Sequence, residues 1–325
     1  MLKNILVAYN GLPGSDAALK GAVQVQQRFD TDLTGLFAHG NPFLSRQLHK
    51  AWMPQKMQDA IVEAADSPSD DIREKFDEIC QVVPAEKKTW INSGGSVQTT
   101  VTRYSRLFDL TILGMHEKSF AHNLSHLELF PDRIALESGR PVLVFPSNPP
   151  VDCFDKTIVI AWDGKRAAAR ALADAKLFLK VGHNVDLVSI GRMPLAEATP
   201  GVDIGKLFKN HGWNVTISEI PLSKKTISQT LVEHCRNVDA GLLVMGAYEH
   251  SPLREGLFGG VTQDISLGAE IPVSMSHQRF LQVQYAVASP SHASGSPGWP
   301  RHPSILLRLP VYRVDRFIPS HEKRR

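Results

Sequence analysis

Cysteine is scarce in this sequence. The 325 residues include three cysteines, Cys80, Cys153 and Cys235, which lie far apart and form no CxxC pair. This spacing argues against both a disulfide framework and a zinc ribbon. Because isolated thiols suit a reducing compartment, we expect a cytoplasmic protein, and we expect Cys153 and Cys235 to be buried or inert rather than nucleophilic.

Long apolar runs are also missing. No stretch of the sequence approaches the roughly 18 apolar residues that a membrane-spanning helix requires. The N-terminal segment MLKNILVAYNG has too short an apolar run for a signal peptide. We therefore expect a soluble protein without a membrane partner.

The sequence has little net charge, and its positive charge is unevenly placed. The formal net charge is +3, yet residues 278–325 carry eight Lys or Arg against two Asp or Glu, which leaves 28 against 31 for residues 1–277. Nucleic acid is therefore an unlikely partner for the body of the protein. The Pro- and Ser-rich composition of residues 278–325 predicts a disordered tail without a function of its own. The alternative is that its basic end touches nucleic acid or an anionic membrane.

Familiar catalytic motifs are absent too. No GxGxxG follows a predicted strand, and the loop from Gly11 to Ser15 lacks the Gly-Lys-Ser/Thr ending of a phosphate loop. His122 and His126 are four residues apart with Glu128 nearby, which is the spacing of a metal pair, but a solvated helix face is the simpler interpretation. We therefore predict that the protein is not an enzyme and that it has no metal site.

The sequence does contain an alternation of strand and helix signals up to residue 146. Short β-branched and apolar runs alternate with segments of helical periodicity, and this order is typical of a parallel sheet covered by helices on both faces. The predicted strands are 4–9, 32–39, 88–92, 110–114 and 141–146, and the predicted helices are 17–29, 48–83 (interrupted near residue 68) and 96–107. Ser15 or Asp16 is expected to cap the first helix.

The same order then repeats after a Pro-rich joint. Asp163 and Gly164 stand where Asn10 and Gly11 stood in the first copy. The predicted strands are 156–161, 185–190, 213–220, 242–246 and 271–275, and the predicted helices are 167–181, 202–211 and 226–237. We infer an α/β protein with two tandem five-stranded units packed as an internal pseudo-dimer. The predicted domains are 1–148 and 156–277, joined by a linker at 149–155 and followed by the tail 278–325.

The stretch 242–262, LLVMGAYEHSPLREGLFGGVT, predicts an anion site. An apolar strand ends at Gly246, a polar loop follows, and Gly259 and Gly260 precede what looks like a helix start. Glycines let backbone amides approach a ligand closely, and the first turn of a helix offers free N–H groups to a phosphate.

These residues resemble the universal stress protein family in its tandem, two-domain bacterial form. The family motif is G-x2-G-x9-G-S/T after the fourth strand, and Gly246 and Gly259 match its first and third glycines with the correct spacing. Glu249 stands where the second glycine is expected, and Gly260 where Ser or Thr is expected. The resemblance covers residues 1 to about 277. It implies Rossmann-like units of the adenine nucleotide alpha hydrolase type that bind ATP, with or without Mg²⁺.

The resemblance also implies a role for each matching residue. Asp163, at the end of the first strand of the second unit, would accept a hydrogen bond from the ribose or base. The phosphates would be held by backbone amides and one hydroxyl, in the segment formed by Met245, Gly246, Gly259, Gly260, Val261 and Thr262. The function implied is that of a stress-response protein regulated by an adenine nucleotide, with a protein partner that the sequence does not identify.

Several departures from the family pattern leave alternatives open. Glu249 places a negative charge where phosphate should lie, which disfavours ATP unless the side chain turns outward or holds Mg²⁺. In the first unit Asn10 replaces the Asp and no Gly-Gly follows Gly114, so we expect a degenerate site there. The glycines could be turn residues alone, and Asp163 could cap the helix near Ala167 or hold the turn before it, in which case the protein would be a nucleotide-independent scaffold. Slow ATP hydrolysis and a further homodimer are left undecided. A ligase or transferase of the wider adenine-binding α/β group is a third alternative, for which Arg254 and His250 are the only catalytic candidates in the loop.

Overall fold

The computed structural model describes residues 2–40, 69–115, 129–191, 199–247, 265 and 269–277. Residues 1–280 form one compact unit. Its strands are β1 (Asn4–Ala8), β2 (Asp32–His39), β3 (Lys88–Gly94), β4 (Leu110–Gly114), β5 (Val142–Phe145), β6 (Thr157–Ala161), β7 (Asn184–Ile190), β8 (Asn214–Ile220), β9 (Ala240–Gly246) and β10 (Val273–Ser276). Its α-helices are α1 (Pro13–Phe29), α4 (Val97–Ser105), α5 (Pro131–Ser138), α6 (Arg166–Ala175), α8 (Ile204–Lys209) and α9 (Ile227–Asn237), and residues 69–79 are also helical. Short 3-10 turns, η1 (Ala85–Lys87) and η3 (Cys153–Asp155), precede β3 and β6.

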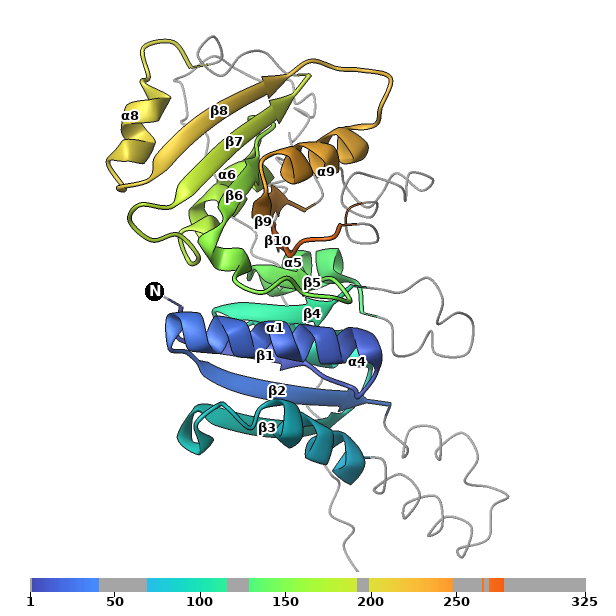
Figure 1. Cartoon of the computed structure of the whole chain (residues 1–325). Helices are drawn as coiled ribbons and strands as arrows, with labels where there is room; N and C mark the ends of the chain where they lie inside the picture. Colours follow the sequence, from blue (N-terminus) through green and yellow to red (C-terminus); the bar gives the residue numbers. More distant parts are fainter. Residues whose placement is uncertain are drawn as a thin grey trace, which may run out of the picture. The chain divides into compact units, whose positions relative to one another are not determined.

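The strands form one ten-stranded sheet in the order β3-β2-β1-β4-β5-β10-β9-β6-β7-β8 (Figure 1). Within β1 to β5, and again within β6 to β10, every pairing is parallel. The two sets meet at one antiparallel pairing, in which β10 runs against β5 with Ser274 opposite Leu143. The predicted α/β class with parallel sheets is therefore confirmed. The strand order of the first set recurs in the second, while the predicted domain bounds stay a prediction.

Helices cover both faces of the sheet, and each face has its own apolar core. One core joins the sheet to α1, the helix at 69–79, α6 and α8, and includes Leu19, Phe76, Ala171 and Phe208. The other joins it to α4, α5 and α9. Strands buried on both faces need apolar residues at successive positions, which explains the runs ILVA in β1 and LLVM in β9.

Two predicted helix boundaries are wrong. α1 begins at Pro13, after Leu12 as N-cap, so Ser15 and Asp16 lie inside its first turn and do not cap it. Proline suits the first helical position because its missing N–H would have no intrahelical partner there. Instead of capping, the Ser15 hydroxyl accepts from the Asn10 N–H at 3.3 Å and donates to the Leu12 carbonyl at 2.8 Å. At the other boundary, α6 ends at Ala175 rather than continuing to residue 181.

Helix α5 was not anticipated from the sequence. It begins at Pro131 and ends before Gly139, which adopts the left-handed conformation with φ 71°. Proline at the first position and glycine after the last residue are ordinary boundary signals, and they were present in the sequence. None of the described helices combines the length and the apolar character that crossing a bilayer requires. The predicted helix at 48–68, the pair His122 and His126, and the predicted tail at 278–325 lie outside the described residues.

Candidate functional site

The sheet changes winding direction between β6 and β9. These two strands are parallel neighbours, yet the chain leaves β6 toward β7 and β8 on one side and later reaches β9 and β10 on the other. In open α/β sheets, ligands bind outside the carboxyl ends of strands at such a switch point. Asp163 follows β6 and Gly246 ends β9, so the structure brings these two predicted residues to the same edge of the sheet.

Asp163 already has one partner in the chain. Its Oδ1 atom accepts a hydrogen bond from the backbone N–H of Lys165, the N-cap residue of α6, at 3.0 Å. In the first set Asn10 does the same, because its Oδ1 accepts from the Leu12 N–H at 3.1 Å. Both side chains therefore hold the turn that leads into a helix, as the structural alternative for Asp163 anticipated. They differ in charge, since Asp163 presents a carboxylate where Asn10 presents an amide.

Gly246 lets the start of helix α6 pack closely against the end of β9. A Cβ atom built on it would lie 2.7 Å from the Cβ and carbonyl carbon of Ala167 and 2.8 Å from the amide nitrogen of Ala168. Gly114, at the end of β4, meets the start of α1 even more closely, with the Gly14 carbonyl oxygen 2.0 Å from such a Cβ. The glycines at the ends of both strands thus let a helix N-terminus pack directly on the sheet edge.

Of the other residues predicted to contact the nucleotide, only Met245 lies within the described part of the chain. The side chain of Met245 is buried in the core under α9, so a ligand at the sheet edge could reach only its backbone. Gly259, Gly260, Val261 and Thr262 lie outside the described residues, as do the loop residues Glu249, His250 and Arg254.

A side-chain network that the sequence did not reveal lies over the corresponding turn of the first set. The ammonium group of Lys75, from the helix at 69–79, contacts Asp16 at 2.7 Å and donates to the Gly11 carbonyl at 3.0 Å. The Tyr9 hydroxyl donates to the other Asp16 oxygen at 2.8 Å. Burial and the hydrogen bond to this carboxylate raise the pKa of Tyr9 well above its usual value. The turn after β1 is therefore tied down by residues of its own chain.

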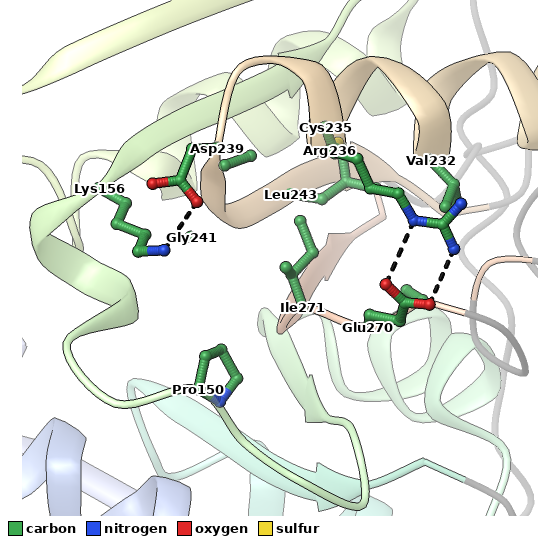
Figure 2. Close-up of a pocket in the computed structure, with 12 residues that line it drawn as sticks. Pro150, Lys156, Val232, Cys235, Arg236, Asp239, Gly241, Leu243, Glu270 and Ile271 are labelled. Carbon is green, nitrogen blue, oxygen red and sulfur yellow. Dashed lines mark hydrogen bonds and ion pairs between the residues drawn. The ribbon is translucent and has the colours of Figure 1, made fainter.

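A cavity of about 290 Å³ lies at the other end of the β6 and β9 strands (Figure 2). It is lined where β9 begins, at Ala240 and Gly241, and by residues of α9 and the segment before β10. Leu243, Ile271 and Pro150 line it between two ion pairs, which Figure 2 shows on either side of them. Since Gly246 ends β9 and Gly241 stands near its start, this cavity is distinct from the predicted nucleotide site.

Each ion pair of the cavity joins neighbouring segments of the chain. Lys156 contacts Asp239 at 2.7 Å, and the Arg236 guanidinium holds Glu270 through two hydrogen bonds of 2.8 and 3.2 Å. Cys235 also lines the cavity, but burial raises the pKa of its thiol to about 12. A thiol with such a pKa is protonated at neutral pH and is a poor nucleophile. All three cysteines are free and buried, as expected for Cys153 and Cys235.

A buried acid and histidine pair was also missed by sequence reasoning. Asp186 of β7 faces α9, where His234 Nε2 lies 2.8 Å from its Oδ2 atom. The side chains are 4% and 13% exposed, and Asp186 Oδ1 has no hydrogen-bond partner in the described structure. The signal available was the single carboxylate within the apolar strand NVDLVSI. Within the described ranges, no group of three or more His, Cys, Asp or Glu is placed to hold a metal ion.

Comparison with known proteins identifies the fold. No protein-family model matches the sequence, and neither does any curated protein. Among solved structures, a universal stress protein from Archaeoglobus fulgidus DSM 4304 superimposes with a TM-score of 0.64 over 84% of this chain and 98% of its own, at 15% identity. The chain has the universal stress protein fold. The sequence resemblance is thereby confirmed at the level of the fold.

Two further structures are similar to this universal stress protein fold. A protein of unknown function from Pseudomonas aeruginosa PAO1 is 16% identical, with 85% of this chain and 92% of its own covered and a TM-score of 0.45. A universal stress protein in complex with cAMP is 18% identical, covers 38% of this chain and 96% of its own, and has a TM-score of 0.31. Because both TM-scores are below 0.5, the fold assignment rests on the archaeal protein.

Proposed function

We propose that this chain is a member of the universal stress protein family that binds an adenine nucleotide, ATP with or without Mg²⁺, at the carboxyl end of β6 and β9. The observation that carries the proposal is the meeting of Asp163 and Gly246 at the switch point of the sheet, beside the first turn of α6. The spacing from Gly246 to Gly259 in the sequence adds to it.

The chemistry of this edge suits a nucleotide. Asp163 has a second carboxylate oxygen besides the one that accepts from Lys165, and a ribose hydroxyl is a suitable donor for it. The close packing at Gly246 keeps the start of α6, with its positive dipole end, next to the strand end. The segment 259–262 would supply the amides and the Thr262 hydroxyl for the phosphates. The role is regulatory: nucleotide occupancy changes the surface offered to a protein partner in a cytoplasmic stress response.

The rival function is a scaffold that binds no nucleotide. The Asp163 hydrogen bond favours it, because the same turn contact exists at Asn10 and explains the residue without a ligand. The Glu249 carboxylate in the phosphate loop favours it too.

Calorimetry of the full chain with ATP and Mg²⁺ tests the proposal. The informative variant is Asp163→Asn, because an amide oxygen at this position can still accept from the following turn, as Asn10 does. We expect it to weaken ATP binding about tenfold, the effect of losing one charge-assisted hydrogen bond of roughly 1.4 kcal/mol, while the melting temperature changes little. The matched control is Asn10→Asp, which makes the reciprocal change in the first set and should not alter ATP binding.

Two further measurements distinguish a nucleotide-binding protein from a scaffold that binds no nucleotide. Glu249→Gly should strengthen binding if the site is active but weakened by the carboxylate. Absence of binding heat at millimolar ATP, in both the natural chain and Glu249→Gly, would establish the scaffold instead.

A further inference from the structure

Strand β8 ends the sheet next to β7 and has an open outer edge in the part of the chain that the structure describes. Its seven residues pair with β7 in one unbroken register, from Asn184 opposite Asn214 to Ile190 opposite Ile220. The Asn214 N–H donates to the His183 carbonyl, and the Ile220 carbonyl accepts from Gly191. Backbone groups alternate in direction along a strand, so those of the odd-numbered residues of β8 point away from β7.

The surroundings of this edge are unusually apolar. Ten large apolar side chains are exposed in the described ranges, and three of them lie on β8, on the neighbouring helix α8, or directly after the strand. Ile217, at the centre of the strand, is 41% exposed, and Leu222 just after it is 66% exposed. Helix α8, which covers this face, has only six residues and leaves its own Leu207 exposed.

The opposite end of the same sheet shows a protected edge. Strand β3 occupies the corresponding place in the first set and is covered by the helix at 69–79, whose Phe76 ring packs 4.8 Å from the Trp90 ring. Lys88 of β3 also forms an ion pair with Asp77 of that helix at 2.8 Å. Charged residues and covering helices are the usual protection of an edge strand. Each edge strand has one charged residue and one covering helix, but the helix over β3 spans residues 69–79 whereas α8 over β8 has only six residues.

We propose that β8 is a docking edge for a second copy of this chain, with the two β8 strands paired antiparallel across a two-fold axis at Ile217. In this register Ile217 lies opposite the partner's Ile217, and Val215 lies opposite the partner's Glu219. Each of these pairs exchanges both N–H···O=C bonds through the backbone groups that point away from β7. Thr216 then lies opposite the partner's Ser218, a favourable pair of hydroxyl side chains.

Two observations favour a second copy over an unrelated peptide. The strand is self-complementary, because the two-fold axis places its single charged residue opposite Val215 and no like charges meet. The chain already joins two sheet edges in this manner, since β5 and β10 pair antiparallel. A contact made by one strand edge buries less surface than a standard interface, so the dimer is weak and concentration-dependent.

Sedimentation velocity of the full chain over a concentration series measures the dimer. Ile217→Lys places two ammonium groups opposite each other and should raise the dimer dissociation constant by at least about tenfold. Ile217→Pro should act similarly without breaking the sheet, because the Ile217 N–H points away from β7. Leu107→Lys is the matched control, since it makes the same change at a more exposed residue of the first set and should leave dimerisation unchanged.

Cross-linking identifies the edge directly. Ile217→Cys should be joined to its own copy by a short bismaleimide, whereas Val181→Cys, at an exposed position off the strand, should not. The natural chain is the background, because burial raises the thiol pKa of Cys80, Cys153 and Cys235 to about 12. A chain that stays monomeric at all concentrations, or a dimer insensitive to Ile217→Lys and Ile217→Pro, would overturn the proposal. Because ATP is absent from both assays, the outcome does not depend on nucleotide binding.

Discussion

The substitution Gly246→Ala tests whether the approach of α6 to the end of β9 serves a ligand as well as the fold. The added methyl group would lie 2.7 Å from Ala167 and 2.8 Å from the Ala168 nitrogen, and part of what it meets is backbone that cannot rotate away. Ordinary contacts begin at 3.4 Å, so the start of α6 must retreat by about 0.7 Å. Overpacking of this kind costs roughly 1–3 kcal/mol, which lowers the melting temperature of a unit of this size by roughly 2–5 °C.

Differential scanning fluorimetry and calorimetry with ATP provide the two readouts for Gly246→Ala. The melting temperature should fall, and ATP affinity should fall with it because the first turn of α6 moves away from the strand end. Gly114→Ala is the matched control: it meets the Gly14 carbonyl at 2.0 Å and should destabilise the protein more, yet leave ATP affinity unchanged when assayed well below the transition. An unaltered melting temperature for Gly246→Ala would refute the packing argument, and equal losses of ATP affinity in both variants would refute its link to the site.

Three further predictions concern stability. His234→Ala leaves the Asp186 carboxylate buried without a partner and should lower the free energy of unfolding, measured by chemical denaturation, by about 3 kcal/mol. Adding Asp186→Val should recover part of this loss, and strictly additive costs of the two substitutions would contradict the coupling. Gly241→Ala should destabilise the protein severely, because its Cβ would lie 1.8 Å from the Cys153 carbonyl oxygen in the turn before β6. A soluble variant with the natural melting temperature would argue against that contact. Burial, followed by the charge of Arg28, lowers the pKa of His183 from 6.5, so folding disfavours its protonation. The stability that this group contributes should be present above pH 6.5 and lost as pH falls through its folded pKa, and His183→Gln should flatten that part of a denaturation series.

Most of the sheet was predictable from the sequence because its inner strands are buried on both faces, whereas the outermost strands, β3 and β8, are partly exposed. Runs such as NILVA and TIVIA have no polar side to misassign, and all ten predicted strands are present. Helix boundaries were harder to predict, since they depend on capping geometry. The first helix starts at Pro13, and the side chain of Ser15 bonds inside its first turn instead of capping it, a contact that no periodicity signal reports.

The candidate site was only partly predictable. The positions of Asp163 and Gly246 followed from the repeat, since equivalent residues of two copies must lie at equivalent strand ends. The hydrogen bond from Lys165 and the packing of Ala167 against Gly246 require coordinates, because they depend on where α6 starts. Contacts between distant residues, such as Lys75 with Asp16 and His234 with Asp186, leave no local pattern in a single sequence.

The antiparallel joint of β5 and β10 also fixes which way the two turns face. Since every strand of the first set runs opposite to every strand of the second, the turn at Asn10 and the turn at Asp163 open on opposite edges of the sheet. Five strand spacings separate β1 from β6, which is about 24 Å at the usual inter-strand distance. No small ligand can bridge the two turns, so each turn would need a ligand of its own.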